Sequence, residues 1–343
     1  MSKTEHTDIL IVGQGLAGTL LSYQLLKKKI SHKVVDTAVD GRASEAAAGL
    51  INPIVVKRMK RAWQADLFHP YAATLYQTLE KMLETDVYHP MPINKIYDAQ
   101  DEVFWQQRNA KEELGNYIST PARYDLPKGI HQPYGYGSIL PSARLNMAQL
   151  LKSYRQYLIT HKLLIEANFK DTDLTLGNNA VHWHNINARR IVFCRGAFDA
   201  ESSYFKYLKW NNTKGELLDV NIKNLSINNI LSKGIFVMPT GDGNFKLGAT
   251  YDHHWNSLAP SIEKRNELLK KWSVLSDLPL TIHRQLTGLR PTLASRQAVS
   301  TFLENYPQIG IFNGLGSRGG LMAPYLSFLM SNKIKNSLAK RGK

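Results

Sequence analysis

The stretch GQGLAG at residues 13–18 decides the fold of this chain. It follows an apolar run at residues 9–12 and precedes an apolar-periodic pattern, which is the order strand, glycine turn, helix. In such a unit Gly13 permits the tight turn, Gly15 lets the backbone approach phosphates, and Gly18 lets the helix pack closely on the strand. The start of the helix offers N–H groups and a positive dipole end to an anion, so the stretch predicts a dinucleotide site.

A second apolar pair, Val34-Val35, ends at Asp36. This is the spacing of the acidic residue that hydrogen-bonds a ribose hydroxyl in dinucleotide-binding folds. The alternative is a glycine-rich turn that holds no ligand. The strand, the turn, the helix and the acidic residue together favour the dinucleotide site.

Composition fits a two-domain globular enzyme. The chain has 343 residues, of which 43% are hydrophobic and 21% charged. No stretch reaches the roughly 18 to 20 apolar residues that cross a bilayer, and residues 1–8 carry no secretory pattern. We therefore expect a cytoplasmic protein with no membrane span.

Cysteine and histidine usage predicts neither a disulfide nor a metal site. Cys194 is the single cysteine, and it lies in an apolar run. The pairs His182/His184 and His253/His254 lack further ligands at the spacing of a known metal motif.

The charge balance is strongly basic, with 43 Lys and Arg against 28 Asp and Glu and a formal net charge of +15. Basic clusters occur at residues 27–29, at residues 57–61 and in the C-terminal tail. Such a surplus attracts polyanions, nucleic acids among them. The alternative is a set of lysines spread over a solvated surface, since no aromatic-interleaved nucleic-acid motif is visible.

Several segments have helical periodicity. Leu67, Tyr71, Leu75 and Leu79 form a predicted apolar stripe, and Ser142 is a predicted N-cap. The predicted helices cover about residues 64–83, a segment that starts at Pro141-Ser142, about residues 262–275, and the chain after the glycine-dense loop 314–320.

Two other segments are β-rich. Residues 88–140 suggest strands and loops, and in the second segment Gly215, Gly241, Gly243 and Gly248 mark predicted turns. We predict an α/β, Rossmann-like nucleotide-binding domain built from the discontinuous segments 1–87, 141–200 and 285–343. Residues 88–140 and 201–284 would form a β-rich α+β substrate domain, with the binding site at the interface.

Three further motifs carry a resemblance to a known family. They are SEAAAGL at residues 44–50, GLRP at 288–291 and GLGSRGGLMAP at 314–324. Their order and spacing over nearly the whole chain resemble FAD-dependent oxidoreductases of the D-amino acid oxidase and glycine oxidase family. Small side chains at 44–50 leave room for a flat ring, and the late glycine loop offers N–H groups to a flavin.

The resemblance implies a flavoprotein with non-covalent FAD, because no cysteine lies near the C-terminal loop. It also implies the residues that would contact FAD. They are Gly13, Gly15, Leu16, Ala17, Gly18, Asp36, Ser44, Ala47, Ala48, Gly49, Leu50, Cys194, Arg195, Gly196, Gly316, Ser317, Arg318, Gly319, Gly320 and Leu321.

In this family the arginine matching Arg290 forks the carboxylate of the substrate, a task that suits a planar guanidinium. Arg318 is a second catalytic candidate, and Tyr251 is a candidate substrate-binding residue. The implied reaction is amine oxidation: hydride transfer from the substrate carbon to flavin N5 gives an imine, which water hydrolyses. The alternative for Arg290 is a structural arginine at the domain interface.

Three functions stay open. The first is oxidation of a small amino acid or secondary amine. The second is removal of a carboxymethyl group from a modified wobble uridine, because residues 314–324 are also similar to the oxidoreductase domain of the bifunctional tRNA 5-methylaminomethyl-2-thiouridine enzymes. The basic charge would suit a tRNA partner. The third is a basic binding protein that holds FAD without turnover.

Overall fold

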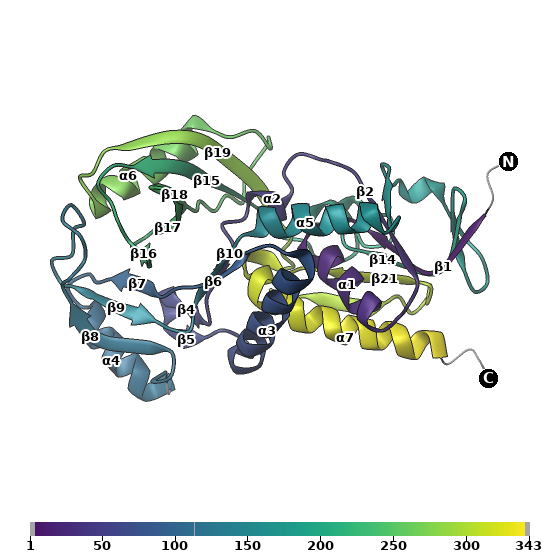
Figure 1. The fold of residues 1–343 in the computed structure, drawn as a ribbon, viewed down its shortest axis with the longest axis horizontal. Coiled ribbons are helices and arrows are strands. Elements are labelled where there is room, and N and C mark those ends of the chain that lie inside the picture. Colours follow the sequence, from purple (N-terminus) through teal and green to yellow (C-terminus); the bar gives the residue numbers. More distant parts are fainter. Residues whose placement is uncertain (1–3, 113, 340–343) are drawn as a thin grey trace.

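The computed structural model describes residues 4–112 and 114–339, which form two eight-stranded sheets with helices around them (Figure 1). The first sheet begins with β1 (Glu5–Val12), α1 (Leu16–Lys27) and β2 (His32–Asp36), the predicted strand–helix–strand unit. β1 pairs in parallel with β2 on one edge and with β14 (Ile186–Phe193) on the other. Residues 9–12 are buried, as expected for a parallel strand covered on both faces.

Segments from the middle and the end of the chain complete this sheet. β11 (Leu164–Glu166) pairs in parallel with β2, and β21 (Ile309–Asn313) pairs in parallel with β14. Antiparallel strands extend the sheet: β12 (Leu174–Leu176), β13 (Val181–Trp183) and β20 (Val299–Phe302). The predicted discontinuous Rossmann-like sheet is confirmed.

Helices cover the first sheet. The C-terminal helix α7 (Gly319–Ala339) packs against α1 and α3 (Ala65–Leu83), and α5 (Met147–Thr160) also contacts α1 (Figure 1). Because neighbours surround it, α1 is buried along almost its whole length. None of the described helices has a stretch long and apolar enough to span a bilayer.

The predicted extent of α3 is correct to one residue, but the predicted stripe is partly wrong. Leu67 is 41% exposed and Tyr71 is only half-buried. A strict four-residue step drifts around a helix with 3.6 residues per turn, so the buried face does not follow it. The buried face includes Phe68, Ala72, Leu75, Tyr76 and Leu79.

The predicted helix start at Ser142 is wrong. Ser142 is buried and donates a hydrogen bond to the carbonyl of Ile139, and the next residues form β10 (Ala143–Leu145). β10 pairs with β3 (Leu50–Ile51) and β6 (Tyr88–Pro90), which satisfies its backbone groups as a strand. The helix starts at Met147, where the Asn146 side chain accepts from the Gln149 N–H at 3.3 Å.

The second sheet is formed by the two β-rich segments. Its strands, in spatial order, are β19 (Leu280–Arg290), β15 (Thr213–Ile222), β18 (Asn244–Gly248), β17 (Phe236–Gly241), β16 (Ile230–Ser232), β7 (Ile93–Ile96), β9 (Tyr136–Ile139) and β8 (Ile118–Arg123). Gly241 and Gly243 lie at the β17–β18 turn. Gly215 lies inside β15, so the turn expected there is wrong, and Gly248 is the last residue of β18. The predicted division at residue 285 falls inside β19, which pairs with β15 up to Arg290. That division remains a prediction.

Two helices accompany this sheet. α6 (Ile262–Leu275) matches the predicted range, and Leu268, Trp272 and Leu275 pack it onto the apolar face of the sheet. α4 (Asp101–Glu112) is a helix in a segment predicted as strands and loops. Trp105 is its only buried residue among those described, so α4 lacks an apolar stripe. The Trp105 ring packs edge-on against the Tyr97 ring, with 5.2 Å between the ring centroids.

Short elements complete the fold. They are α2 (Ala43–Ala46), β4 (Ile54–Val55), β5 (Lys60–Arg61), and the 3-10 turns at Val56–Arg58, Asp171–Asp173, Gly196–Glu201 and Gly316–Arg318.

Candidate active site

A cavity of about 850 Å³ runs from the carboxyl ends of β1, β2 and β14 to the second sheet. In open parallel sheets, ligands bind at this end of the strands. Of the predicted site residues, Gly18, Arg318 and Leu321 do not line the cavity, and the others do. Leu321 is buried in the core on α7, so its side chain packs the protein interior.

The glycine turn has the predicted packing. Gly13 has a φ of +101°, and a Cβ there would lie 2.7 Å from the carbonyl oxygen of Cys194. A Cβ on Gly18 would lie 1.9 Å from the carbonyl oxygen of Gly13, so this glycine sets how closely α1 approaches the turn. A Cβ on Gly15 would meet only the Ser44 hydroxyl, at 3.4 Å, and would otherwise project into open space. The turn thus leaves its free volume where a pyrophosphate is expected to approach.

Asp36 is held by two arginines that the motif analysis missed. Its Oδ1 accepts from the Gln14 N–H at 2.8 Å and from Arg42 Nη2 at 3.1 Å. Its Oδ2 accepts from Arg155 Nη1 at 2.8 Å and from Arg42 Nη1 at 3.3 Å. The side chain of Asp36 is 5% exposed, so these contacts compensate its buried charge. Arg155 lies on α5, far from Asp36 in sequence, and no local pattern indicates it.

We expect Asp36→Asn to weaken FAD binding by about 10- to 100-fold, because a charged hydrogen-bonding group is lost from the predicted ribose site. The measurement is the dissociation constant of FAD from reconstituted apoprotein, followed by flavin fluorescence. Glu166→Gln is the matched control, since Glu166 also pairs with Arg155 at 2.6 Å but is 67% exposed. Equal FAD affinity in the two variants would show that Asp36 has no role in the site.

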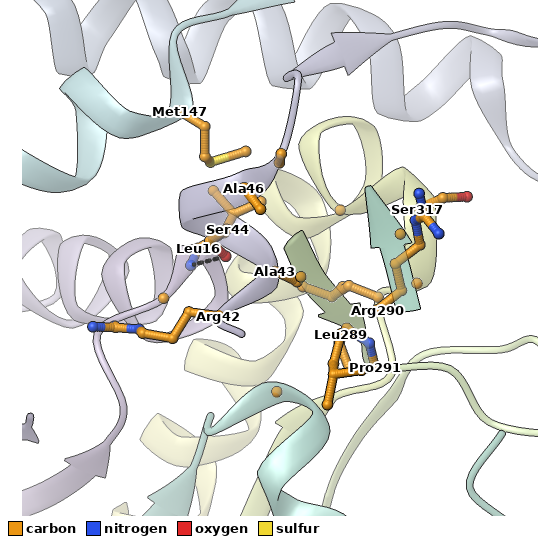
Figure 2. A pocket seen from close by; sticks show the side chains of 18 of the residues that line it. Leu16, Arg42, Ala43, Ser44, Ala46, Met147, Leu289, Arg290, Pro291 and Ser317 are labelled. Atoms are coloured by element: carbon orange, nitrogen blue, oxygen red, sulfur yellow. Dashed lines mark hydrogen bonds between the residues drawn. The ribbon is translucent and has the colours of Figure 1, made fainter. Parts of the chain in front are cut away.

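The small-residue loop at 43–50 packs directly on β19. A Cβ on Gly288 would lie 3.0 Å from Ala43 Cα and Ala46 Cβ. Leu289 donates its N–H to the carbonyl of Gly41 at 2.9 Å. Figure 2 shows Ala43 and Ala46 of α2 together with Leu289 and Arg290 of β19. The Ser44 hydroxyl accepts a hydrogen bond from the Leu16 N–H at 3.1 Å. The contact brings the end of β19 to the cavity.

Cys194, Arg195 and Gly196 also line the cavity, but the Arg195 side chain is already engaged. Its Nε donates to Asp199 at 2.7 Å and its Nη2 to Asp171 at 3.1 Å. Burial raises the pKa of the Asp199 carboxyl, and Arg195 opposes that shift. Burial also raises the pKa of the Cys194 thiol, so the thiol packs as a neutral group.

The C-terminal loop closes the cavity from the other side. Gly314 and Gly316 have φ values of +76° and +54°, which favour glycine. α7 begins at Gly319, and the carbonyl of Gly320 accepts from the Tyr76 hydroxyl at 2.8 Å. Gly316, Gly319 and Gly320 line the cavity from this side, together with Leu315 and Ser317.

Arg290 lies at the end of β19 between Tyr251 and Gly215. Its guanidinium carbon is 4.1 Å from the ring centroid of Tyr251, and its Nη2 donates to the carbonyl of Thr250 at 3.1 Å. A Cβ on Gly215 would lie 2.1 Å from that nitrogen, so only glycine fits beneath the guanidinium. Arg290 Nη1 is buried and has no acceptor among the described residues.

Arg318 is a second guanidinium of the same kind. Its Nη1 is also buried without an acceptor in the part of the chain that the structure describes. Burial lowers the pKa of both Arg290 and Arg318, and the Tyr251 phenol opposes the shift in both, which indicates that the three groups lie near one another. Arg290 lines the cavity and its unused donor suits an anionic ligand, whereas Arg318 does not line the cavity.

Together, these features define a dinucleotide-binding enzyme with a substrate cavity between two sheets. The chain belongs to the DAO family of FAD dependent oxidoreductases, whose sequence model matches residues 8–332. FAD is therefore the cofactor. The glycine turn, the segment 43–50 and the C-terminal loop fit it, because most of their residues that line the cavity are glycine or alanine and leave room for the cofactor beside the backbone.

Individual relatives are distant but cover nearly the whole chain. The chain is 24% identical to the uncharacterized oxidoreductase YurR of Bacillus subtilis (strain 168), over 92% of each protein. Glycine oxidase from Geobacillus kaustophilus superimposes with a TM-score of 0.81 at 16% identity, covering 97% of this chain and 95% of that one. Iminodiacetate oxidase from Chelativorans sp. BNC1 superimposes with a TM-score of 0.77 at 18% identity, covering 96% and 95%. At these identities the two structures establish the shared fold.

Proposed function

We propose that this enzyme oxidises the C–N bond of a small amino acid or secondary amine that carries a carboxylate. The observation that supports this most is Arg290, a positioned guanidinium with an unused buried donor in the lining of the cavity. Similarity in fold to a glycine oxidase and an iminodiacetate oxidase, named for acids of this type, supports the same substrate class.

We assign the cofactor contacts to the backbone of the glycine turn and the C-terminal loop, with Asp36 toward the ribose. Bound FAD supplies the two-electron acceptor that the oxidation needs. Arg290 binds the substrate carboxylate in a fork, and the Thr250 carbonyl and the Tyr251 ring hold the guanidinium in place. Fixing the carboxylate fixes the α-carbon, which is a matter of positioning rather than of acid–base catalysis.

The substrate amine reacts in its neutral form. Its lone pair forms the C=N bond as the α-carbon gives up its hydrogen with two electrons. The resulting imine takes up water and separates into a carbonyl compound and an amine. No side chain of this protein is required to change its covalent state.

A carboxymethylamino group on a tRNA wobble uridine would offer the same carboxylate and C–N bond. The net charge of +15 is the observation that favours this second candidate. We rank it below the small substrates. Arg290 would anchor the carboxylate of either substrate, and an excess of basic residues alone does not identify a nucleic acid as the partner.

Anaerobic reduction of the bound flavin tests these proposals. We expect glycine, sarcosine, iminodiacetate or a D-amino acid to bleach the flavin. Bleaching by wobble-modified tRNA alone would favour the nucleic-acid substrate. Absence of bleaching with every donor would contradict both and leave a protein that binds FAD without turnover.

A further inference from the structure

A second cavity, of about 410 Å³, is formed where β6 and β10 meet the β17–β18 hairpin and the loop 225–228. None of the described residues that line it also lines the FAD cavity. Its volume is in the range of small-molecule sites, which is about 300 to 1,000 Å³. The family motifs do not include any of its residues.

Arg144 and His89 stand side by side in this cavity. They are directly paired across the antiparallel strands β10 and β6, so their side chains share one face. Arg144 Nε and His89 Nε2 are both buried, and neither has a hydrogen-bond partner in the described structure. Buried donors are normally satisfied, so two unsatisfied nitrogens in one cavity indicate a missing acceptor.

The charge of Arg144 is only partly compensated. Within residues 4–112 and 114–339 Arg144 forms no ion pair, although the acidic Asp242 also lines the cavity. Asp86 lies 3.6 Å from His89 Nδ1 but its side chain is 81% exposed. Glu80 Oε1 accepts from the backbone N–H groups of Val87 and Tyr88.

The protonation behaviour of the pair agrees with this geometry. Burial lowers the pKa of Arg144, and Asp86 only partly opposes it. Burial and the neighbouring Arg144 lower the pKa of His89, against Asp86 and Glu80. Arg144 is thus a partly buried cation beside a histidine, and the acidic residues Asp86 and Glu80 offset the effect of burial on this pair only in part.

We propose that this cavity is a second ligand site, in which Arg144 and His89 bind the oxyanion of a small molecule, a carboxylate or a phosphate. A guanidinium pairs with either group through parallel hydrogen bonds, and the His89 Nε2 supplies a further donor when it carries the proton. Ser226, Asn228 and Asn244 at the cavity wall provide polar groups for the rest of the molecule.

Titration calorimetry of the FAD-loaded enzyme tests the site, with inorganic phosphate as one probe and citrate as the other. We expect saturable binding of at least one probe, at one per chain, and the stronger probe identifies phosphate or carboxylate as the preferred group. Arg144→Gln should weaken this binding by about 10- to 100-fold, the usual range for loss of a charged hydrogen bond. His89→Gln should weaken it less.

Two control variants separate this site from other cations. Arg290→Leu removes the proposed substrate anchor and Arg296→Gln removes an exposed arginine, and both should retain binding. A folding defect is excluded by melting temperature: in phosphate-free buffer Arg144→Gln should melt no lower than the parent protein, since a partly buried charge is lost. Added probe should raise the melting temperature of the parent protein and of both control variants by more than that of Arg144→Gln.

The proposal is overturned if neither probe binds saturably to the parent protein. It is also overturned if Arg144→Gln and the parent bind equally, or if binding is lost in Arg290→Leu and kept in Arg144→Gln. The last result would place the anion in the substrate cavity.

Discussion

Replacing Arg290 with leucine is expected to lower kcat/KM for the preferred carboxylate-bearing amine by about 100- to 1,000-fold, while FAD content stays at the parental level. The estimate corresponds to about 3 to 4 kcal/mol, within the range found when one partner of a buried charged contact is truncated. Leucine keeps much of the packing volume beside Gly215 but cannot bind a carboxylate. Steady-state kinetics and the flavin-to-protein absorbance ratio measure the two quantities.

Arg284→Leu is the matched control for this variant. Arg284 lies on the same strand, is 65% exposed and pairs with Asp219, so its loss should leave kcat/KM within about twofold. If Arg290→Leu instead loses FAD or unfolds, Arg290 serves as a structural arginine at the interface of the two sheets, which is the alternative that the sequence left open.

Gly15→Val is expected to give a folded protein that binds FAD about 10- to 100-fold more weakly. This corresponds to a loss of about 1 to 3 kcal/mol of binding free energy, the usual cost of inserting extra carbon atoms into a packed site. The reason is that a side chain at this position projects into the cavity rather than into protein atoms, since only the Ser44 hydroxyl lies within contact range of its Cβ. Equilibrium binding of FAD to apoprotein and far-UV circular dichroism provide the two readouts.

Two comparisons make the Gly15 result specific. Gly115→Val, at an exposed site with only the Asn109 side chain near, should bind FAD normally. Gly18→Val should impair folding itself, because its Cβ would lie 1.9 Å from a backbone oxygen. A Gly15→Val protein that binds FAD as tightly as the parent would contradict the placement of the pyrophosphate at this turn.

Local signals in the sequence predicted the parts of the fold that depend on neighbouring residues. The glycine turn was predicted correctly because steric limits between neighbouring residues specify it. α6 was predicted correctly because its apolar residues recur with helical periodicity. Ser142 was assigned wrongly because strand pairing of Ala143–Leu145 with two distant strands outweighs a local cap signal.

The residues of the candidate site also separate into those that local sequence signals predict and those that they do not. Most residues of the motifs line the cavity, whereas Arg155 was not singled out in the sequence and Gly215 was predicted only as a turn. Arg155 acts on Asp36 from another helix, and the role of Gly215 depends on the Arg290 side chain of the neighbouring strand. Such contacts are set by tertiary pairing and leave no periodic or spaced pattern along the chain.

The most direct test of the central claim is anaerobic reduction of the FAD-loaded enzyme by matched pairs of donors, each an amino acid or secondary amine acid and its carboxamide. Anchoring of the substrate carboxylate by Arg290 predicts that at least one acid bleaches the flavin and that its carboxamide does so about 100-fold more slowly, since the amide gives up the charged contact with Arg290. Equal rates for acid and carboxamide, or no bleaching by any acid in the series, would contradict it.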